Sequence, residues 1–230
     1  MFDGKFRAPV DRAVKPIGNI LRKTGLTPDH LTILGLLVAV GAAVAIGSGH
    51  LRLGLVLVIL AALPDLFDGA LAKASNTSSQ RGAFFDSVID RVTDALLFGG
   101  LAWYFATGDD PRLAVLPYAV MAVSSVISYE RAKAESLGLD AKGGLMERAE
   151  RIIALCIGLL FDVLLVPLLW VMLVLTAITA VQRFAKVWKQ AAVAPVTAAK
   201  IEMRRGRRQT RRVVRTERRR TRISRPGRSQ

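Results

Sequence analysis

DLFDGALAKASNTSSQRGAFFDSVID, residues 65–90, is the stretch on which the interpretation of the whole chain depends. It carries four aspartates, and the segments on both sides of it are apolar and long enough to cross a membrane. A carboxylate at membrane depth is costly, so it indicates a functional site in which partners offset the charge. The sequence therefore predicts a membrane protein with an acidic site between two of its helices.

The spacing of the aspartates predicts how they meet. Asp65 and Asp68 are three residues apart and Asp86 and Asp90 are four apart, so each pair lies on one face of its helix. Because the connection between the two helices is short, they should run antiparallel and bring the pairs together at one end. Four converging carboxylates form a site for a hard cation, Mg²⁺ with Mn²⁺ or Ca²⁺ as alternatives, rather than for zinc.

Composition and hydropathy agree with this interpretation. Of the 230 residues, 52% are hydrophobic, and the mean hydropathy is +0.36. Recurring apolar stretches predict an all-α integral membrane protein with six transmembrane helices. The expected spans cover about residues 30–48, 52–73, 83–106, 112–134, 148–165 and 167–188. A turn near Pro167 is expected between the last two spans.

Two basic segments flank this six-helix domain, which covers residues 24–190. Residues 1–23 place apolar side chains at helical spacing among Lys and Arg, which predicts an amphipathic helix at the membrane surface. Residues 191–230 hold 14 Lys and Arg against two Glu, so most of the net charge of +15 belongs to this tail. We expect the tail to be disordered and to bind anionic lipid. It lacks the interleaved aromatic residues of a nucleic-acid-binding arm, so no nucleic acid is expected.

Basic residues also predict the orientation in the membrane. The N-terminal segment, the 73–81 loop, the 131–151 region and the tail carry nearly all the Lys and Arg, while the alternate loops contribute only Arg52 and Arg112. By the positive-inside rule, both termini face the cytoplasm. The chain is thus expected to be a multi-pass protein of the cell membrane. All four aspartates would lie at the cytoplasmic ends of the second and third spans, where water-soluble metal and nucleotide can reach them.

Small residues accompany the aspartates. Gly69, Ala72 and Gly82 would let a ligand approach the helix backbone, although close helix packing is an alternative explanation for each. If the ligand is such a nucleotide, its pyrophosphate needs metal ions between it and the carboxylates, and two cations would stabilise both the attacking and the leaving oxygens of a transfer reaction. Asp90 would then take the proton of an acceptor hydroxyl as general base. Because no Ser-His or Cys-His pairing is visible, we expect direct in-line transfer.

Basic residues gather at the same end of the last three spans. They are Arg131, Lys133, Arg148, Arg151 and Arg183. Level with the metal site, they would form a cationic pocket suited to a phosphorylated acceptor, although flanking charge under the positive-inside rule explains any one of them equally well. Asp94, one helical turn beyond Asp90, is expected to pair helices rather than to bind metal.

Residues 65–90 resemble the signature of the CDP-alcohol phosphotransferase family, D-x2-D-G-x2-A-R-x8-G-x3-D-x3-D. The matching residues are Asp65, Asp68, Gly69, Ala72, Gly82, Asp86 and Asp90. Lys73 departs from the pattern because the family has Arg there, and Lys keeps the charge but loses the bidentate fork. The resemblance implies a membrane enzyme with a CDP-linked lipid donor, CMP as leaving group, and a divalent metal held by the four aspartates. The residues implied to contact the donor nucleotide are Asp29, Gly69, Ala72, Lys73 and Gly82.

Shorter stretches are similar to the actinobacterial phosphatidylinositol phosphate synthases of that family. They are TPD at 27–29, SYERAKAESLGL at 128–139, GGLMERAER at 143–151 and VQR at 181–183. This similarity implies CDP-diacylglycerol as donor, inositol phosphate as acceptor, and a homodimer. The positions implied to bind the acceptor are Ser128, Arg131, Lys133, Arg151 and Arg183. One alternative is a sister enzyme, a phosphatidylglycerophosphate synthase that uses glycerol 3-phosphate. Another, of a different class, is a cation transporter, although transporters more often carry internal repeats.

Overall fold

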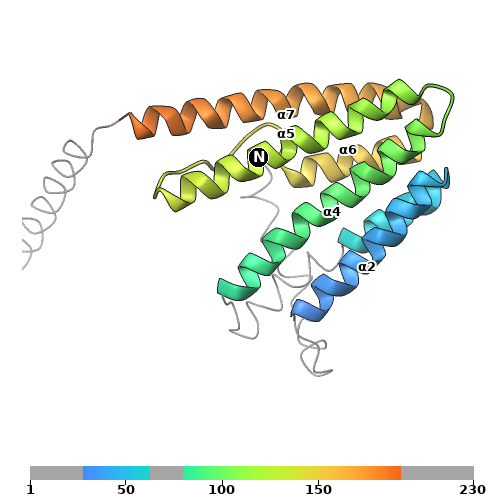
Figure 1. Cartoon of the computed structure of the whole chain (residues 1–230), viewed down its shortest axis with the longest axis horizontal. Coiled ribbons are helices and arrows are strands. Elements are labelled where there is room, and N and C mark those ends of the chain that lie inside the picture. The colour runs from blue at the N-terminus through green and yellow to red at the C-terminus, as the bar shows by residue number, and fades with distance from the viewer. Residues whose placement is uncertain (1–27, 63–79, 193–230) are drawn as a thin grey trace, which may run out of the picture. The chain divides into compact units, whose positions relative to one another are not determined.

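The computed structural model describes residues 28–62 and 80–192, and every regular element in those ranges is a helix. These are α2 (Pro28–Gly47), α4 (Gln80–Ala106), the 3-10 helix η1 (Pro111–Ala114), α5 (Val115–Ser136), α6 (Arg148–Leu160) and α7 (Asp162–Ala191) (Figure 1). A further apolar helix, Leu51–Ala62, follows α2 and reaches the edge of the described residues. The predicted helix at 1–23 and nearly all of the basic tail lie outside the described ranges.

The chain divides into two compact units, Met1–Phe184 and Ala185–Gln230. The boundary between them falls within α7, directly after Phe184. Every described residue of the candidate site belongs to the first unit.

Three of the described helices are long and apolar enough to cross a membrane. They are Asp29–Gly47, Pro111–Ser136 and Asp162–Ala191. Large apolar side chains on them are open to the surroundings, including Leu37, Tyr118 and Trp170, which are 63%, 62% and 54% exposed. Such surfaces are unfavourable in water but match the acyl chains of a bilayer. The predicted all-helical membrane fold is confirmed in this coarser form, whereas the count of six spans stays a prediction.

A single buried apolar cluster draws on all of the α-helices named above. Phe98 of α4 lies in this cluster at 1% exposure, together with Ile46 of α2, Val120 of α5, Leu159 of α6 and Leu169 of α7. Filling the interior with branched and aromatic side chains fixes how the helices sit against one another. The polar residues at one end of α4 are thereby held at a defined place relative to α6.

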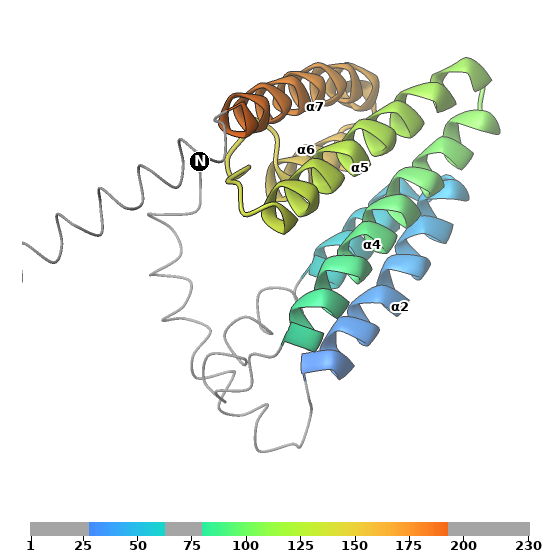
Figure 2. The ribbon, with the colours of Figure 1, turned by 60° about the vertical axis from the view of Figure 1, so that its left-hand side comes forward.

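Gly100 explains how closely α2 approaches α4. The two helices lie side by side in both views, and both begin at the same end (Figures 1 and 2). A Cβ atom at Gly100 would lie 2.5 Å from the carbonyl oxygen of Ala43, so only glycine fits there. Small residues at such crossings are typical of packed membrane helices. The contact places Asp29, in the first turn of α2, at the same end as the start of α4.

Most predicted helix boundaries agree with the structure to within a few residues. The span predicted at 30–48 is α2, which begins two residues earlier, at Pro28, with Asp29 in its first turn. Proline at the first position and an acidic residue in the first turn both favour a helix start. The span predicted at 83–106 is α4, which begins three residues earlier, at Gln80. The span predicted at 112–134 is η1 followed by α5, and Asp110 caps η1 by accepting the N–H of Arg112 at 3.2 Å.

The predicted turn near Pro167 is wrong. α6 ends at Leu160 and α7 begins at Asp162, so Phe161 alone separates them, with φ −121° and ψ 93°, and Pro167 lies inside α7. Asp162 favours a helix start because its carboxylate complements the dipole of the first turn. Proline inside a helix removes one backbone donor, and membrane helices tolerate this loss. The fifth helix is therefore shorter than the predicted 148–165, and the sixth begins earlier.

Candidate active site

One stripe along α4 carries the aspartates of the candidate site that the structure describes. Gly82, Asp86, Asp90 and Asp94 follow one another at four-residue intervals, so they share a face of the helix. The first three are partly buried, and Asp94 is 8% exposed. The common face predicted for Asp86 and Asp90 is therefore present. The other residues of the predicted donor and metal site, Asp65, Asp68, Gly69, Ala72 and Lys73, lie outside the described residues.

Two arginines from the start of α6 reach this stripe. The Nη1 atom of Arg148 lies 2.7 Å from Oδ1 of Asp90, and its Nε atom lies 3.3 Å from Oδ1 of Asp94. The Nη2 atom of Arg151 lies 2.8 Å from Oδ2 of Asp94, and Arg151 is 4% exposed. Asp94 thus joins α4 to α6, as expected of a helix-pairing residue. Removing one partner of such a buried ion pair typically costs about 3–5 kcal/mol.

The position of these arginines on α6 is unusual. Arg148 and Arg151 are the first and fourth residues of the helix, where the positive end of the helix dipole disfavours cations. Glu150, in the same turn, has the favoured sign. Residues that break a local preference are expected at functional sites, where a tertiary partner compensates. Here Asp90 and Asp94 supply the compensating charge.

Arg183 fixes the segment that leads into α6. Its Nε donates to the carbonyl oxygen of Gly143 at 3.0 Å, its Nη1 to that of Ile127 at 3.2 Å, and its Nη2 to Oε1 of Glu147 at 3.0 Å. Only 4% of Arg183 is exposed. The guanidinium therefore links α5, the segment before α6, and α7 in one set of charge-assisted hydrogen bonds. Glu147 was not singled out from sequence, and its place just before a helix rich in arginine was the available signal.

Thr179, one turn before Arg183, holds the same segment a second time. Its Oγ1 accepts the backbone N–H groups of Leu145 at 3.1 Å and of Met146 at 3.0 Å. A Cβ atom at Gly144 would collide with the methyl group of Thr179, so this approach requires glycine. Through these contacts, α7 determines where α6 begins and hence where its two arginines lie.

The remaining residues of the predicted acceptor pocket lie on α5. Ser128 is partly buried and donates to the carbonyl oxygen of Ser124 at 3.0 Å. Arg131 and Lys133 are exposed, and Arg131 pairs with Glu135 at 3.0 Å. The structure therefore pairs Arg151 with the buried Asp94 and Arg183 with the partly buried Glu147, while the two cations of α5 stay at the surface. Arg148, which the similarity to relatives did not single out, makes the closest described contact to Asp90.

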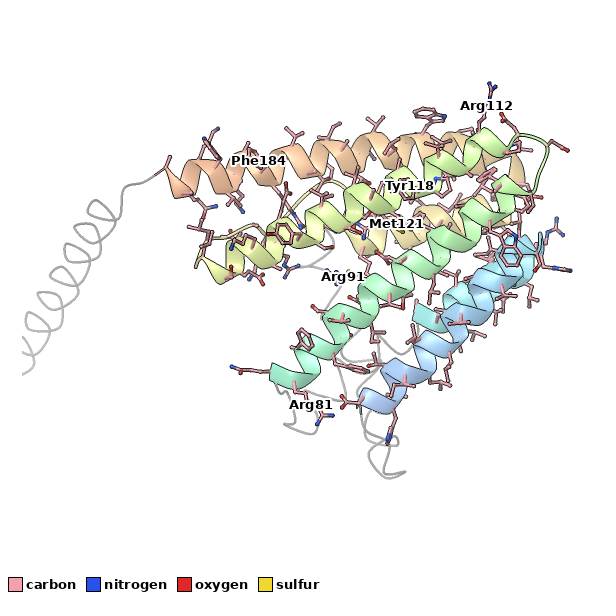
Figure 3. All side chains as sticks on the ribbon, viewed as in Figure 1. Arg81, Arg91, Arg112, Tyr118, Met121 and Phe184 are labelled. Atoms are coloured by element: carbon pink, nitrogen blue, oxygen red, sulfur yellow. The ribbon has the colours of Figure 1, made fainter. Side chains whose placement is uncertain are left out.

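Basic residues at the two ends of α4 also agree with the charge pattern of the sequence. Arg81 lies at the start of this helix, and Arg112 lies in η1 at the far end, as Figure 3 shows. Arg91 lies between them and, from the same helix, reaches Oδ2 of Asp90 at 3.4 Å. Arg81, at the end of the predicted cation-rich loop, and Arg112, in the predicted cation-poor loop, therefore lie at opposite ends of α4. Which end faces the cytoplasm stays a prediction.

The described acidic residues suit part of a metal site. Within residues 28–62 and 80–192, no three His, Cys, Asp or Glu side chains gather closely enough to hold an ion. Asp86 and Asp90 nevertheless offer carboxylate oxygens from one helix face, which is the chemistry of a hard divalent cation. The partners predicted for them, Asp65 and Asp68, lie in the part of the chain that is not described.

The fold and the site together define a helical membrane protein in which arginines of α6 form ion pairs with the acidic face of α4. The chain belongs to the CDP-alcohol phosphatidyltransferase family, whose model matches residues 25–182. It is similar to the phosphatidylinositol phosphate synthase of Mycolicibacterium smegmatis, with 37% identity over 187 residues that cover 77% of this chain and 84% of that protein. It is also similar to that of Streptomyces avermitilis, with 35% identity over 207 residues that cover 84% of this chain and 85% of that protein.

Solved structures of the same type of enzyme share the fold. Mycobacterium tuberculosis phosphatidylinositol phosphate synthase with CDP-DAG bound has a TM-score of 0.72 and 36% identity, covering 77% of this chain and 94% of that one. The same enzyme in complex with manganese and citrate has a TM-score of 0.72 and 35% identity, covering 76% of this chain and 88% of that one.

Proposed function

We propose that this protein transfers the phosphatidyl group of CDP-diacylglycerol to inositol phosphate, giving phosphatidylinositol phosphate and CMP. Its family and its relatives, which are named phosphatidylinositol phosphate synthases, support this assignment. The structure of a relative with CDP-DAG bound supports the identity of the donor. The observation that carries the proposal in this chain is the shared face of Asp86 and Asp90, with an arginine 2.7 Å from Asp90.

Divalent metal would be held by Asp86 and Asp90 together with Asp65 and Asp68. A bound Mg²⁺ or Mn²⁺ would neutralise the pyrophosphate and stabilise the attacking and leaving oxygens. The manganese complex of a relative supports metal binding. Asp90 would accept the proton of the acceptor hydroxyl. The hydroxyl oxygen then bonds to the phosphorus of the phosphatidyl group, and the bond from that phosphorus to the oxygen of CMP breaks.

The acceptor phosphate would meet cations from three helices. Arg151 carries a buried Nε that has no hydrogen-bond partner among the described residues, so it retains a donor for an anion. Arg183 approaches from α7, and Ser128, Arg131 and Lys133 would complete the set from α5. The names of the relatives favour inositol phosphate over glycerol 3-phosphate. Family membership favours a transferase over a cation transporter.

The donor nucleotide would lie at the other side of the metal. Its contacts are proposed to be Asp29, Gly69, Ala72, Lys73 and Gly82. Asp29 and Gly82 both lie at the starts of their helices, α2 and α4, which begin at the same end (Figure 1). We further propose six spans in the cell membrane, both termini and the site on the cytoplasmic side, and a homodimer.

Assay of the purified protein with labelled CDP-diacylglycerol tests the function. We expect CMP release and labelled phosphatidylinositol phosphate when inositol phosphate and Mg²⁺ or Mn²⁺ are supplied. Glycerol 3-phosphate and free inositol, offered at the same concentration, should give little product. Turnover with glycerol 3-phosphate alone, or full turnover in the presence of a metal chelator, would contradict the proposal.

A further inference from the structure

We propose that Arg148 is a positioning residue that orients the Asp90 carboxylate through a bridge between Asp90 and Asp94. This inference rests on the proposed function, in which Asp90 binds metal and takes the proton from the acceptor. By its place in the sequence, Arg148 is one of the cations suited to an anionic acceptor. The geometry points instead to a role directed at the reacting carboxylate.

One guanidinium joins two carboxylates that are a helical turn apart. Nη1 of Arg148 lies 2.7 Å from Oδ1 of Asp90, while Nε lies 3.3 Å from Oδ1 of Asp94. A carboxylate rotates readily about its last side-chain torsion, and a short charge-assisted hydrogen bond limits that rotation. The side chains of Arg148 and Asp90 are 28% and 20% exposed, so solvent screens the pair. Its main effect is therefore on the direction of the Asp90 oxygens rather than on stability.

Contacts on the side away from Asp90 restrain Arg148 itself. Asp94 is fixed by the buried Arg151, with side-chain exposures of 12% and 5% for the two partners. The backbone that leads into Arg148 is tied to α7 by Thr179 and Arg183. Each contact limits the freedom of the next, so the position of the Asp90 carboxylate is set from α6 and α7 as well as from its own helix. Partners outside the ligand shell commonly tune a metal site in this way.

Arg91 provides a matched comparison. It also reaches Asp90, at 3.4 Å, but it is the next residue on the same helix and its side chain is 44% exposed. Its Nη1 also donates to the carbonyl oxygen of Ser87 at 2.9 Å. Arg91 therefore brings the same charge near the same carboxylate without a bridge to another helix.

The test compares R148Q, R148K and R91Q in the purified full-length protein. Mn²⁺ binding is measured by electron paramagnetic resonance of the free ion, and kcat and KM are measured with CDP-diacylglycerol and inositol phosphate. For R148Q we expect Mn²⁺ affinity and kcat each to fall by roughly 10–100-fold, as for other outer-shell partners of metal ligands, with KM for inositol phosphate nearly unchanged. R148K should lie between R148Q and the natural protein, because Lys cannot bridge both carboxylates with a fork. R91Q should leave Mn²⁺ affinity nearly unchanged.

Several results would overturn the inference. Tighter Mn²⁺ binding by R148Q would mean that Arg148 competes with metal, and a raised KM for inositol phosphate at constant kcat would make it an acceptor ligand. Equal losses of Mn²⁺ affinity in R91Q and R148Q would mean that the positive charge near Asp90, and not the bridge to Asp94, is what matters. If R148Q does not accumulate, R148K, which keeps the charge but loses the fork, should still bind Mn²⁺ more weakly than the natural protein. Absence of product from the natural protein would refute the proposed function instead, and the Mn²⁺ measurement would still decide the role of Arg148.

Discussion

The ion pairs of Asp94 allow a quantitative prediction for the substitution Asp94→Ala. This change leaves Arg151, which is 4% exposed, without the carboxylate that lies 2.8 Å away, and it also removes one partner of Arg148. Leaving the buried charge of Arg151 unpaired costs about 3–5 kcal/mol. Loss of the contact to Arg148, whose side chain is 28% exposed, adds little because solvent screens it. For a chain of this size each kcal/mol lowers Tm by about 2–4 °C, so the loss should be roughly 6–20 °C.

Thermal unfolding of the purified protein in detergent, followed by circular dichroism, measures this loss. The control is Glu135→Ala, which breaks the Arg131–Glu135 pair, whose side chains are 47% and 52% exposed, and should change the free energy of unfolding by less than about 1 kcal/mol. The double variant D94L/R151M should recover most of the stability, because it removes both charges and keeps the volume apolar. A Tm of D94A equal to that of E135A would refute the reasoning.

Packing, backbone hydrogen bonds and metal binding give three further predictions. G100A should lower Tm clearly because its Cβ meets the backbone of Ala43, whereas G99A, whose Cβ meets nothing within 4 Å, should leave Tm unchanged or slightly raised; equal effects in an unfolding experiment would contradict this. T179V should cost about 1–3 kcal/mol and speed amide hydrogen exchange in the segment before α6, because two backbone N–H groups lose their acceptor. D86N should weaken Mn²⁺ binding measured by calorimetry and leave Tm within about 2–4 °C of the natural protein, and unchanged affinity would remove Asp86 from the ligand set.

The features that the sequence predicts well are those set by local geometry. The apolar runs placed the starts of α2 and α4 within three residues, and four-residue spacing put Asp86 and Asp90 on one face. The turn assigned to Pro167 failed because proline is a strong stop signal in water, while a helix in lipid tolerates it.

Pairings between distant segments could not be predicted in this way. Arg148 meets Asp90 across 58 positions of sequence, and Arg183 meets Glu147 across 36. Periodicity states which face of a helix a residue occupies but not which residue faces it from the next helix. The similarity to known synthases selected Arg151 and Arg183 as acceptor ligands, and the structure adds that carboxylates already occupy both guanidinium groups. An incoming phosphate must therefore share these guanidinium groups with the carboxylates, and the Nε of Arg151 still has a donor to offer it.

The shortness of α6 has a consequence for the surrounding lipid. Its 13 residues rise only about 20 Å, whereas the hydrocarbon layer of a bilayer is about 30 Å thick. If Phe161 lies level with one row of headgroups, Arg148 stands about 10 Å below the other row. Either the bilayer is locally thinner around this helix, or a water-filled cavity lets solvent reach the arginines at its start. The inositol phosphate of the proposed reaction would then enter the protein to react, while the lipid donor stays in its own leaflet.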